Sequence, residues 1–374
     1  GRITWQASDK DKIGIFANYA NTCSCVQGVS ATLAPEAALN NIIPNQLTQL
    51  TWTRVATNKL LIETGYTNLW TSFRFPREAG SADYTVSATD IPTTELSTGF
   101  SFNARASTSL PYTDGPENFS DPAGQRNARA AVSYVSGNHA LKVGTTLAFG
   151  GLEVNGRNNE IPGFGPASIR LLNGVPNSLL LSMSPVYQKQ TFRNIGVYAQ
   201  DQWSINGRLT LNYGFRGDFF TGSYPDQTIP DTPFVNGFQI TGRSGVPSWK
   251  DGSIRIGAAY RVTADGKTAL KVNFGRYVGA AGAGFPQSVN PATAIVTSAT
   301  RQWTDADGDF FPDGDARNQA ANGELGPISN RAFGTSVVNT NFSNDVMTAN
   351  RPYTYQTSAV LERELAPGFG IWVG

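Results

Sequence analysis

The amino-acid sequence contains six pairs of alternating segments, and a short turn joins the two members of each pair. In the clearest pair, residues 194–205 and 208–219 flank the turn Asn206-Gly207. Apolar and polar side chains alternate in both segments, and Asp201 is the one charge on the apolar side of the first. Successive side chains of a strand point to opposite sides of a sheet. Each segment is therefore predicted to be a strand with one apolar and one polar face.

The other five pairs repeat this pattern, and long segments separate one pair from the next. The paired segments are residues 2–7 and 12–19, 47–55 and 59–68, 127–135 and 140–149, 253–262 and 267–277, and 353–365 with a partner that runs to the last residue. Asn-Gly and Asp-Gly favour short hairpins because both accept a positive φ angle. The separating segments are rich in Gly, Pro, Asn and Asp, and we expect irregular loops at about residues 20–46, 70–126, 150–192, 220–252 and 279–352.

The lengths of strands, turns and loops together favour a transmembrane β-barrel. Strands that cross a membrane need about 9–11 residues and alternate apolar and polar side chains. A soluble sandwich shares the alternation, but its strands average about five or six residues and its turns recur every 8–12 residues. A compact soluble domain also rarely contains even one long unstructured loop. The chain is therefore predicted to be all-β, an antiparallel barrel with short periplasmic turns and long extracellular loops.

The composition agrees with a membrane location and excludes some classes of function. Only 15% of the 374 residues are charged, whereas a soluble domain has about a quarter. No apolar run approaches the roughly 18 residues of a transmembrane helix, but alternating strands escape that test. The net charge is +1, from 29 basic and 28 acidic residues. Without a basic excess, no nucleic-acid partner is expected.

Aromatic residues recur at one offset from the short turns. Trp5, Trp52, Tyr134, Trp203 and Tyr260 each lie three to five residues before a turn. Trp and Tyr favour the membrane–water boundary, where the ring is half-buried and its polar atom is hydrated. Aromatic residues are also common in strands generally. We interpret the shared offset as an aromatic girdle at the periplasmic boundary.

The two ends of the sequence indicate a fragment. The sequence begins at Gly1 without Met or a signal peptide and ends within a strand pattern, so we expect one partial barrel domain over residues 1–374 of a longer protein.

The sequence contains two cysteines, close together in one loop. Cys23 and Cys25 could form a local disulfide, half of a metal site or two thiols. With His139 as the only histidine, a four-ligand zinc site is disfavoured. A disulfide in an oxidising compartment is the preferred interpretation.

An acidic segment in the longest loop is the one candidate metal site. Its five carboxylates alternate with small or turn-forming residues and are those of Asp305, Asp307, Asp309, Asp313 and Asp315. Ca²⁺ takes six to eight oxygen ligands, which alternate loop positions can supply. The EF-hand template fails, because Phe310 stands where Gly is required and Ala316 where Glu is required. A solvated acidic loop without an ion is the alternative.

The sequence contains no convincing catalytic constellation, so the protein is not expected to be an enzyme. His139 has no nucleophile near it in sequence and is expected to be a turn residue. The Gly-rich residues 279–284 lack the Lys-Ser/Thr of a phosphate-binding loop. Charged side chains expected on the polar face could contact a plug or line a water path, or could be ordinary hydrated residues: Arg129, Lys142, Arg216, Asp218, Arg255 and Lys271.

Several segments resemble parts of TonB-dependent outer-membrane receptors. Residues 194–219 are similar to a hairpin of that family in which a YxQDxW strand precedes a short turn and then LTLNYGxR. Residues 265–277, 351–353 and 362–368 resemble the Oar-like branch, which has an amino-terminal carboxypeptidase-regulatory-like domain. The resemblance covers most of the strand-bearing chain, and the set of segments in this order is more specific than any one of them.

The resemblance implies a plugged barrel of 22 strands in the outer membrane of a Gram-negative bacterium, of which about twelve strands are present. It implies transport of an unidentified solute, and a periplasmic energy-coupling protein that pulls on a box near the amino terminus. That box, the plug and the regulatory-like domain are absent from residues 1–374. Outer-membrane lipid is a further expected partner. The alternatives are a surface structural or adhesion protein with its own surface partner, a passive porin, and a secreted soluble Ca²⁺-binding β-protein.

Overall fold

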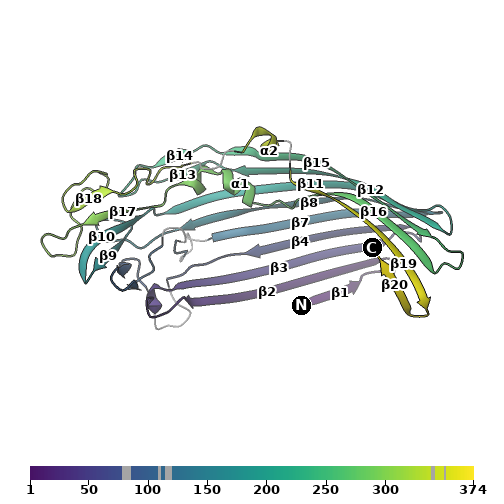
Figure 1. Ribbon diagram of the computed structural model, residues 1–374, viewed down its shortest axis with the longest axis horizontal. Helices are drawn as coiled ribbons and strands as arrows, with labels where there is room; N and C mark the ends of the chain where they lie inside the picture. Colours follow the sequence, from purple (N-terminus) through teal and green to yellow (C-terminus); the bar gives the residue numbers. More distant parts are fainter. Residues whose placement is uncertain (78–85, 108–110, 114–119, 338–341, 349–350) are drawn as a thin grey trace.

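The computed structural model describes residues 1–374 except 78–85, 108–110, 114–119, 338–341 and 349–350. Its main feature is one curved sheet of twelve antiparallel strands, each paired with the next in chain order (Figure 1). The strands are β1 (Arg2–Gln6), β2 (Asp11–Gln27), β3 (Leu39–Val55), β4 (Leu60–Thr71), β7 (Ser120–Ser136), β8 (His139–Gly156), β11 (Val186–Ser204), β12 (Leu209–Tyr224), β15 (Arg243–Arg261), β16 (Thr268–Val278), β19 (Tyr353–Ala366) and β20 (Phe369–Val373). In the described residues the two edge strands, β1 and β20, do not pair with each other, so the sheet is open.

The six strand pairs predicted from the sequence are all present. Most of the long strands continue further toward the loops than the alternation indicates: β2 runs to Gln27 and β11 begins at Val186. Main-chain hydrogen bonds continue there although apolar and polar side chains no longer alternate, and a search for hydrophobic alternation cannot detect such a segment. His139, expected in a turn, is instead the first residue of β8, because only Gly137 and Asn138 form that turn.

The two faces of the sheet differ as predicted. The register places Val143, Val197 and Phe215 on one face, where these three residues are 46–55% exposed. We call this the apolar face, and the opposite one the polar face. The five girdle aromatics lie on the apolar face beside the short turns, where each is paired through the register with residues of that face. Among the helices of the described residues, none is long and apolar enough to cross a membrane.

The expectation of irregular loops is wrong, because the long segments form a second folded layer. A six-stranded sheet contains β5 (Thr93–Glu95), β6 (Phe100–Phe102), β9 (Ala167–Leu172), β10 (Val175–Ser182), β17 (Ser298–Trp303) and β18 (Leu325–Ile328). The loops also contain a hairpin of β13 (Gln227–Ile229) and β14 (Phe238–Ile240) and the short helices α1 (Gly284–Val289), α2 (Asn344–Thr348), η1 (Pro35–Ala37) and η2 (Pro291–Ala294). Of these helices, η1 contacts β6, whereas α1 and α2 contact β15. Most of this layer lies at the end of the long strands opposite the short turns (Figure 1).

The second layer has its own hydrophobic core. Leu179 and Leu181 have no exposed surface, and Trp303 and Phe333 are 1% and 2% exposed. These residues come from different loops and pack in one cluster. The strands of this layer are short, and core partners such as Leu179 and Trp303 lie far apart in sequence. The layer is therefore visible only after the loops are assembled.

Candidate functional site

A groove of about 890 Å³ runs along the polar face of the long sheet and is the main candidate for a solute path. Four cationic side chains line it: Arg129 of β7, Lys142 of β8, Arg216 of β12 and Arg255 of β15. Tyr198, Gln200, Gln202, Asn212 and Asn273 supply further polar groups. The cations face the same side because the register of neighbouring strands aligns them. Four of the six sequence-predicted polar-face charges are thus brought together. Asp218 does not line the groove but pairs with Arg216, and Lys271 lies outside the groove and pairs with Glu362 at 2.6 Å.

Two of these cations are held by carboxylates. Lys142 Nζ lies 2.6 Å from Glu63 Oε2. The Arg216 guanidinium donates to both oxygens of Asp218 at 2.8 Å and to Thr146 Oγ1 at 2.8 Å. Such bidentate pairing fixes the orientation of a guanidinium as well as balancing its charge. These two pairs therefore brace the wall of the groove.

Arg129 and Arg255 differ, because no carboxylate of the described residues lies within 4 Å of either. Arg255 instead stacks over the ring of Tyr277, with 4.7 Å between the guanidinium carbon and the ring centroid. Arg129 passes Gly65, where an added Cβ would lie 2.9 Å from its Nε. The groove therefore has an excess of positive charge, which favours contact with an anionic group.

The acidic loop brings together only part of the predicted set. Carboxylate oxygens of Asp305, Asp307 and Glu324 lie within 4.8 Å of one another. Asp309, Asp313 and Asp315 are outside this group, and Glu324 was missed by the sequence reasoning. It follows the Asn322-Gly323 turn, just before β18, on the far side of the loop. No local sequence signal indicates that it returns to Asp305.

Hydrogen bonds and charge define the chemistry of this loop. Glu324 accepts from the indole of Trp303 and from the main-chain N–H groups of Ala306 and Asp313. These donors, the Ala306 N–H first, lower the pKa of Glu324. Burial, followed by the negative charges of Asp307, Asp309 and Glu324, raises the pKa of Asp313. The loop therefore concentrates negative charge. However, main-chain N–H groups already bond to the Glu324 oxygens that a cation would need as ligands.

Arg301 of β17 holds the far side of the same loop. It is fully buried and donates to the carbonyl oxygens of Gly326 at 2.8 Å, Asn318 at 3.0 Å and Ala320 at 2.9 Å. Burial lowers its pKa, and the charge of Asp315 opposes that effect. A buried guanidinium needs such acceptors, because burying its N–H groups without hydrogen-bond partners lowers the stability of the folded state by about 3 kcal/mol. Arg301 thus fixes residues 318–326, including Glu324, in one conformation.

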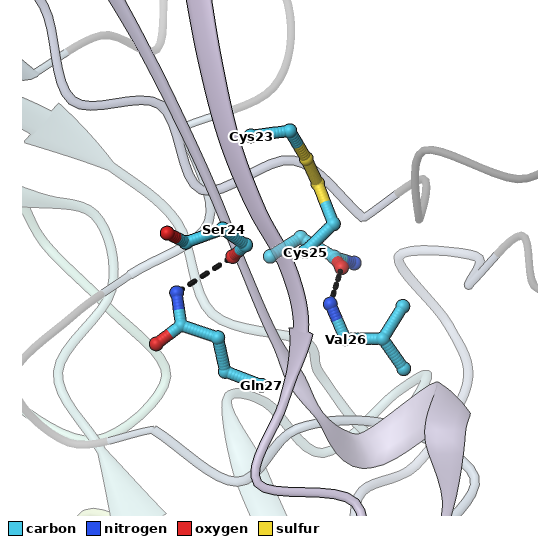
Figure 2. Close-up of a disulfide and its surroundings, with 6 residues drawn as sticks. Cys23, Ser24, Cys25, Val26 and Gln27 are labelled. Carbon is cyan, nitrogen blue, oxygen red and sulfur yellow. Dashed lines mark hydrogen bonds between the residues drawn. A yellow bond between two sulfur atoms is a disulfide. The ribbon is translucent and has the colours of Figure 1, made fainter.

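The cysteines form a disulfide, which confirms the preferred prediction. Figure 2 shows Cys23 and Cys25 bonded through their sulfur atoms near the loop end of β2. The register of β2 and β3 shifts between Ser24 and Gln27 at this position. Gln27 Nε2 donates to the Ser24 carbonyl at 2.6 Å, and the Val26 N–H donates to Asn40 at 2.9 Å. The disulfide is therefore part of a local bulge.

An open antiparallel sheet in simple meander order, with one apolar and one polar face, is the wall of a transmembrane β-barrel. The model of one family, described as an outer membrane beta barrel domain, matches residues 1–374, so the chain belongs to that family. It is accordingly a protein of the Gram-negative outer membrane. No curated protein matches the sequence.

Solved structures of outer-membrane proteins are similar to the chain at low sequence identity. The transporter YddB from Escherichia coli is 13% identical, with a TM-score of 0.47, over 81% of this chain and 37% of that one. The siderophore receptor PiuA from Acinetobacter baumannii is 8% identical, with a TM-score of 0.45, over 99% and 48%. The ferric yersiniabactin uptake receptor FyuA from Yersinia pestis is 9% identical, with a TM-score of 0.39, over 79% and 40%. The chain spans less than half the length of each.

Proposed function

We propose that the chain is part of the barrel wall of a TonB-dependent outer-membrane transporter, in the Oar-like branch, and that a solute moves along its polar face. The observation that carries this proposal is the polar groove with its four aligned cations. Residues 194–219, which resemble the receptor hairpin, supply two strands of that wall. In this proposal a plug and a box for the periplasmic energy-coupling protein belong to other parts of the whole protein.

The proposed route is polar and positively charged. Arg129 and Arg255 carry no described carboxylate partner, whereas Lys142 and Arg216 do. An anionic solute, or acidic side chains of a plug, would complement the two unpaired guanidinium groups. The solute itself is not identified by this geometry.

Binding to the energy-coupling protein tests the proposal. The whole natural protein that contains this chain would be purified in detergent and titrated with the periplasmic domain of the coupling protein from the same bacterium. We expect saturable binding. Absence of binding would instead favour the surface structural or adhesion alternative.

Ion conductance separates the transporter from a passive porin. A plugged transporter in a planar lipid bilayer with potassium chloride should carry almost no steady current, whereas a porin should show stepwise conductance. Membership of the outer-membrane family argues against the third alternative, a secreted soluble β-protein. That alternative would require the protein to stay monodisperse without detergent.

The Ca²⁺ site remains a proposal of its own, now centred on Asp305, Asp307 and Glu324. Their three carboxylates would supply part of the six to eight oxygens that Ca²⁺ takes, and carbonyl groups or water would supply the rest. The raised pKa of Asp313 is consistent with concentrated negative charge at this loop. A bound cation would then stabilise the loop rather than take part in a reaction.

A further inference from the structure

The disulfide between Cys23 and Cys25 closes a very small ring. Only Ser24 separates the two cysteines, and both belong to the same strand, β2. A disulfide stabilises a fold mainly by restricting the unfolded chain, and this effect falls as the closed loop becomes shorter. The bond also connects no second element to the wall. It therefore adds little to the stability of the long sheet.

The disulfide is accessible from the loop side of the membrane. Cys23 is exposed and Cys25 is half-buried. Cys23 lies ten residues beyond Ile13, which pairs in register with the girdle residue Trp52. A tilted barrel strand crosses the hydrocarbon core in about 9–11 residues. With the short turns in the periplasm, the disulfide consequently lies at the outer boundary, where water-soluble thiols reach it.

The ring lies at a contraction of the strand. Between Ser24 and Gln27, β2 contains one residue more than the facing part of β3, and Cys25 belongs to this bulge. The Cα atoms of Cys23 and Cys25 are 5.2 Å apart. Residues at this spacing in an extended strand are separated by about 6.6 Å. The oxidised pair thus keeps this part of β2 shorter than a regular strand.

The bulge also places Val26 in an unfavourable conformation. Its φ angle is 54°, in the left-handed region that a β-branched residue rarely adopts. The Val26 N–H donates to Asn40 Oδ1 at 2.9 Å, and a dashed line in Figure 2 marks this bond. Asn40 is only 7% exposed. A buried amide therefore holds the bulge in place against the strain at Val26.

The bulge determines where the next segment meets the second layer. Residues 28–38 follow it and lie against β6, which η1 also contacts. The Ala34 N–H donates to the Ser101 carbonyl at 2.9 Å, and the Ser101 N–H donates to the Thr32 carbonyl at 3.0 Å. Loss of the bulge would move residues 28–38 by one position relative to β3. These hydrogen bonds would then be out of register.

We propose that the Cys23–Cys25 disulfide is an exchange site for low-molecular-weight thiols, and that its reduction releases residues 28–38 from β6. Strained or exposed disulfides are the labile ones, and this disulfide is exposed and adjoins a strained residue. The proposal concerns an outer segment and depends on neither a coupling protein nor a transported solute. It can therefore fail while the proposed function holds, and the reverse.

Two thiol molecules supply the two electrons of the reduction. The thiolate of the first attacks Sγ of Cys23, the exposed sulfur, and the bond between the cysteines breaks. Cys25 leaves as a thiolate and takes up a proton. The thiolate of the second attacks the small-molecule sulfur of this mixed disulfide. Cys23 then leaves as a thiolate and takes up a proton, and the small molecule departs as its own disulfide.

Equilibration with glutathione tests the exchange. The whole natural protein containing this chain would be purified in dodecylmaltoside and incubated in mixtures of reduced and oxidised glutathione. Acid quenching, alkylation with N-ethylmaleimide and mass spectrometry of the peptide with both cysteines give the reduced fraction. We expect reversible reduction, whereas structural disulfides resist glutathione. A pair that stays oxidised in the folded protein in excess reduced glutathione would overturn the proposal.

Two variants should shift this equilibrium in opposite directions. Val26→Gly relieves the strain of the bulged, oxidised form, so half-reduction should need a ratio of squared reduced to oxidised glutathione about tenfold higher. Asn40→Ala removes the acceptor that holds the bulge and should need a ratio about fivefold lower. Asn45→Ala, also on β3, is the control and should behave as the wild type. Shifts of the same sign, or none, would overturn the link between bulge and disulfide.

Hydrogen exchange tests the release of residues 28–38. On reduction, the amides of Ala34 and Ser101 should exchange about tenfold faster, because their hydrogen bonds open more often. The amide of Ile15, in the membrane part of β2, should keep its protection. Reduction that leaves the Ala34 and Ser101 amides unchanged would refute the release.

A double variant gives the same readout without any thiol. Cys23→Ser with Cys25→Ser cannot form the ring, so its Ala34 and Ser101 amides should exchange as fast as those of the reduced wild type. Ser24→Ala keeps the ring and should exchange as the oxidised wild type does. Heat-dependent migration on SDS gels checks the folding of each variant. Wild-type exchange rates in the folded double variant would contradict the proposal.

Discussion

The imidazole of His139 and the carboxylate of Asp201 form a close pair on the apolar face, with 2.7 Å between Nδ1 and Oδ2. The hydroxyl of Tyr213 donates to the same carboxylate oxygen at 2.7 Å, and the His139 ring stacks on Trp203 with 5.3 Å between centroids. This explains the single charge on the apolar side of β11. Asp201 lies two residues from the girdle residue Trp203, at the membrane boundary, where polar groups that are satisfied by the protein are tolerated.

Removal of Asp201 should destabilise the barrel wall. Asp201→Ala leaves a His139 ring nitrogen and the Tyr213 hydroxyl without their shared acceptor. Because both side chains are about 40% exposed and water can replace part of the lost contact, we expect a loss of about 1 kcal/mol in the free energy of unfolding. Urea titration of tryptophan fluorescence in lipid vesicles measures this loss. Asp9→Ala, at an exposed turn position, is the control and should leave the urea midpoint unchanged. Equal midpoints for the two variants would contradict a stabilising role of Asp201.

Gly196 on the polar face should not tolerate a larger residue. A Cβ at this position would overlap the Arg216 guanidinium and lie 2.6 Å from Thr146 Oγ1. Gly196→Ala is expected to lower the free energy of unfolding by about 1–3 kcal/mol through overpacking. Gly217→Ala is the control, since its added Cβ would have its nearest neighbours at 3.7 Å.

A double-mutant cycle checks the cause of that effect. In an Arg216→Ala background, Gly196→Ala should cost less, because the overlapping guanidinium is gone. The urea midpoints of the four proteins give the coupling between the two positions. An unchanged cost in that background would show that Arg216 is not the obstacle.

Calcium binding to the acidic loop can be measured directly by isothermal titration calorimetry. The wild type is expected to bind Ca²⁺, and Glu324→Gln should weaken binding by about tenfold, because affinity follows the number of charged ligands. Asp345→Asn, in α2, makes the same change of charge away from the loop and should bind as the wild type does. A wild type that gives no binding heat would favour the alternative of a solvated acidic loop.

Glu95 should make local stability in the second layer depend on pH. The Ser97 hydroxyl first, and then the main-chain N–H groups of Ser97, Gly174 and Asn173, lower the pKa of Glu95 from 4.5 to about 2. Because the folded pKa lies below the unfolded one, the stabilising effect is complete above about pH 4.5 and is lost as the pH falls toward 2. Hydrogen exchange of the Asn173 and Gly174 amides, corrected for intrinsic rates, should show falling protection over this range. Glu95→Gln should remove that dependence, whereas Glu160→Gln should retain it.

Loss of Arg301 should open the loop it holds. Arg301→Met leaves the carbonyl groups of Asn318, Ala320 and Gly326 without their donor, so local unfolding should become more frequent. Limited proteolysis is expected to cleave residues 304–324 about tenfold faster than in the wild type. Arg331→Met, which removes an exposed arginine, is the control. Similar cleavage rates for the two variants would mean that Arg301 does not fix the loop.

The alternation of side chains was sufficient to predict the long sheet. Hairpins such as residues 194–219 involve neighbours in sequence, so a short turn and a period of two specify both partners and register. The same pattern placed the girdle aromatics and the polar-face charges on their correct faces. It underestimated β2 and β11, because beyond the membrane neither face needs to be apolar.

The sequence by itself determined the six hairpins of the long sheet and which of their faces is apolar, since the lipid imposes one apolar face on every strand that crosses the membrane. Only the tertiary structure decided the second layer, in which Leu179, Phe234 and Trp303 from separate loops share a core. It also decided that Glu324 joins Asp305, and that His139 reaches Asp201 across 62 positions of the chain. These contacts connect residues distant in sequence that carry no shared period, so their partners are set by packing in three dimensions.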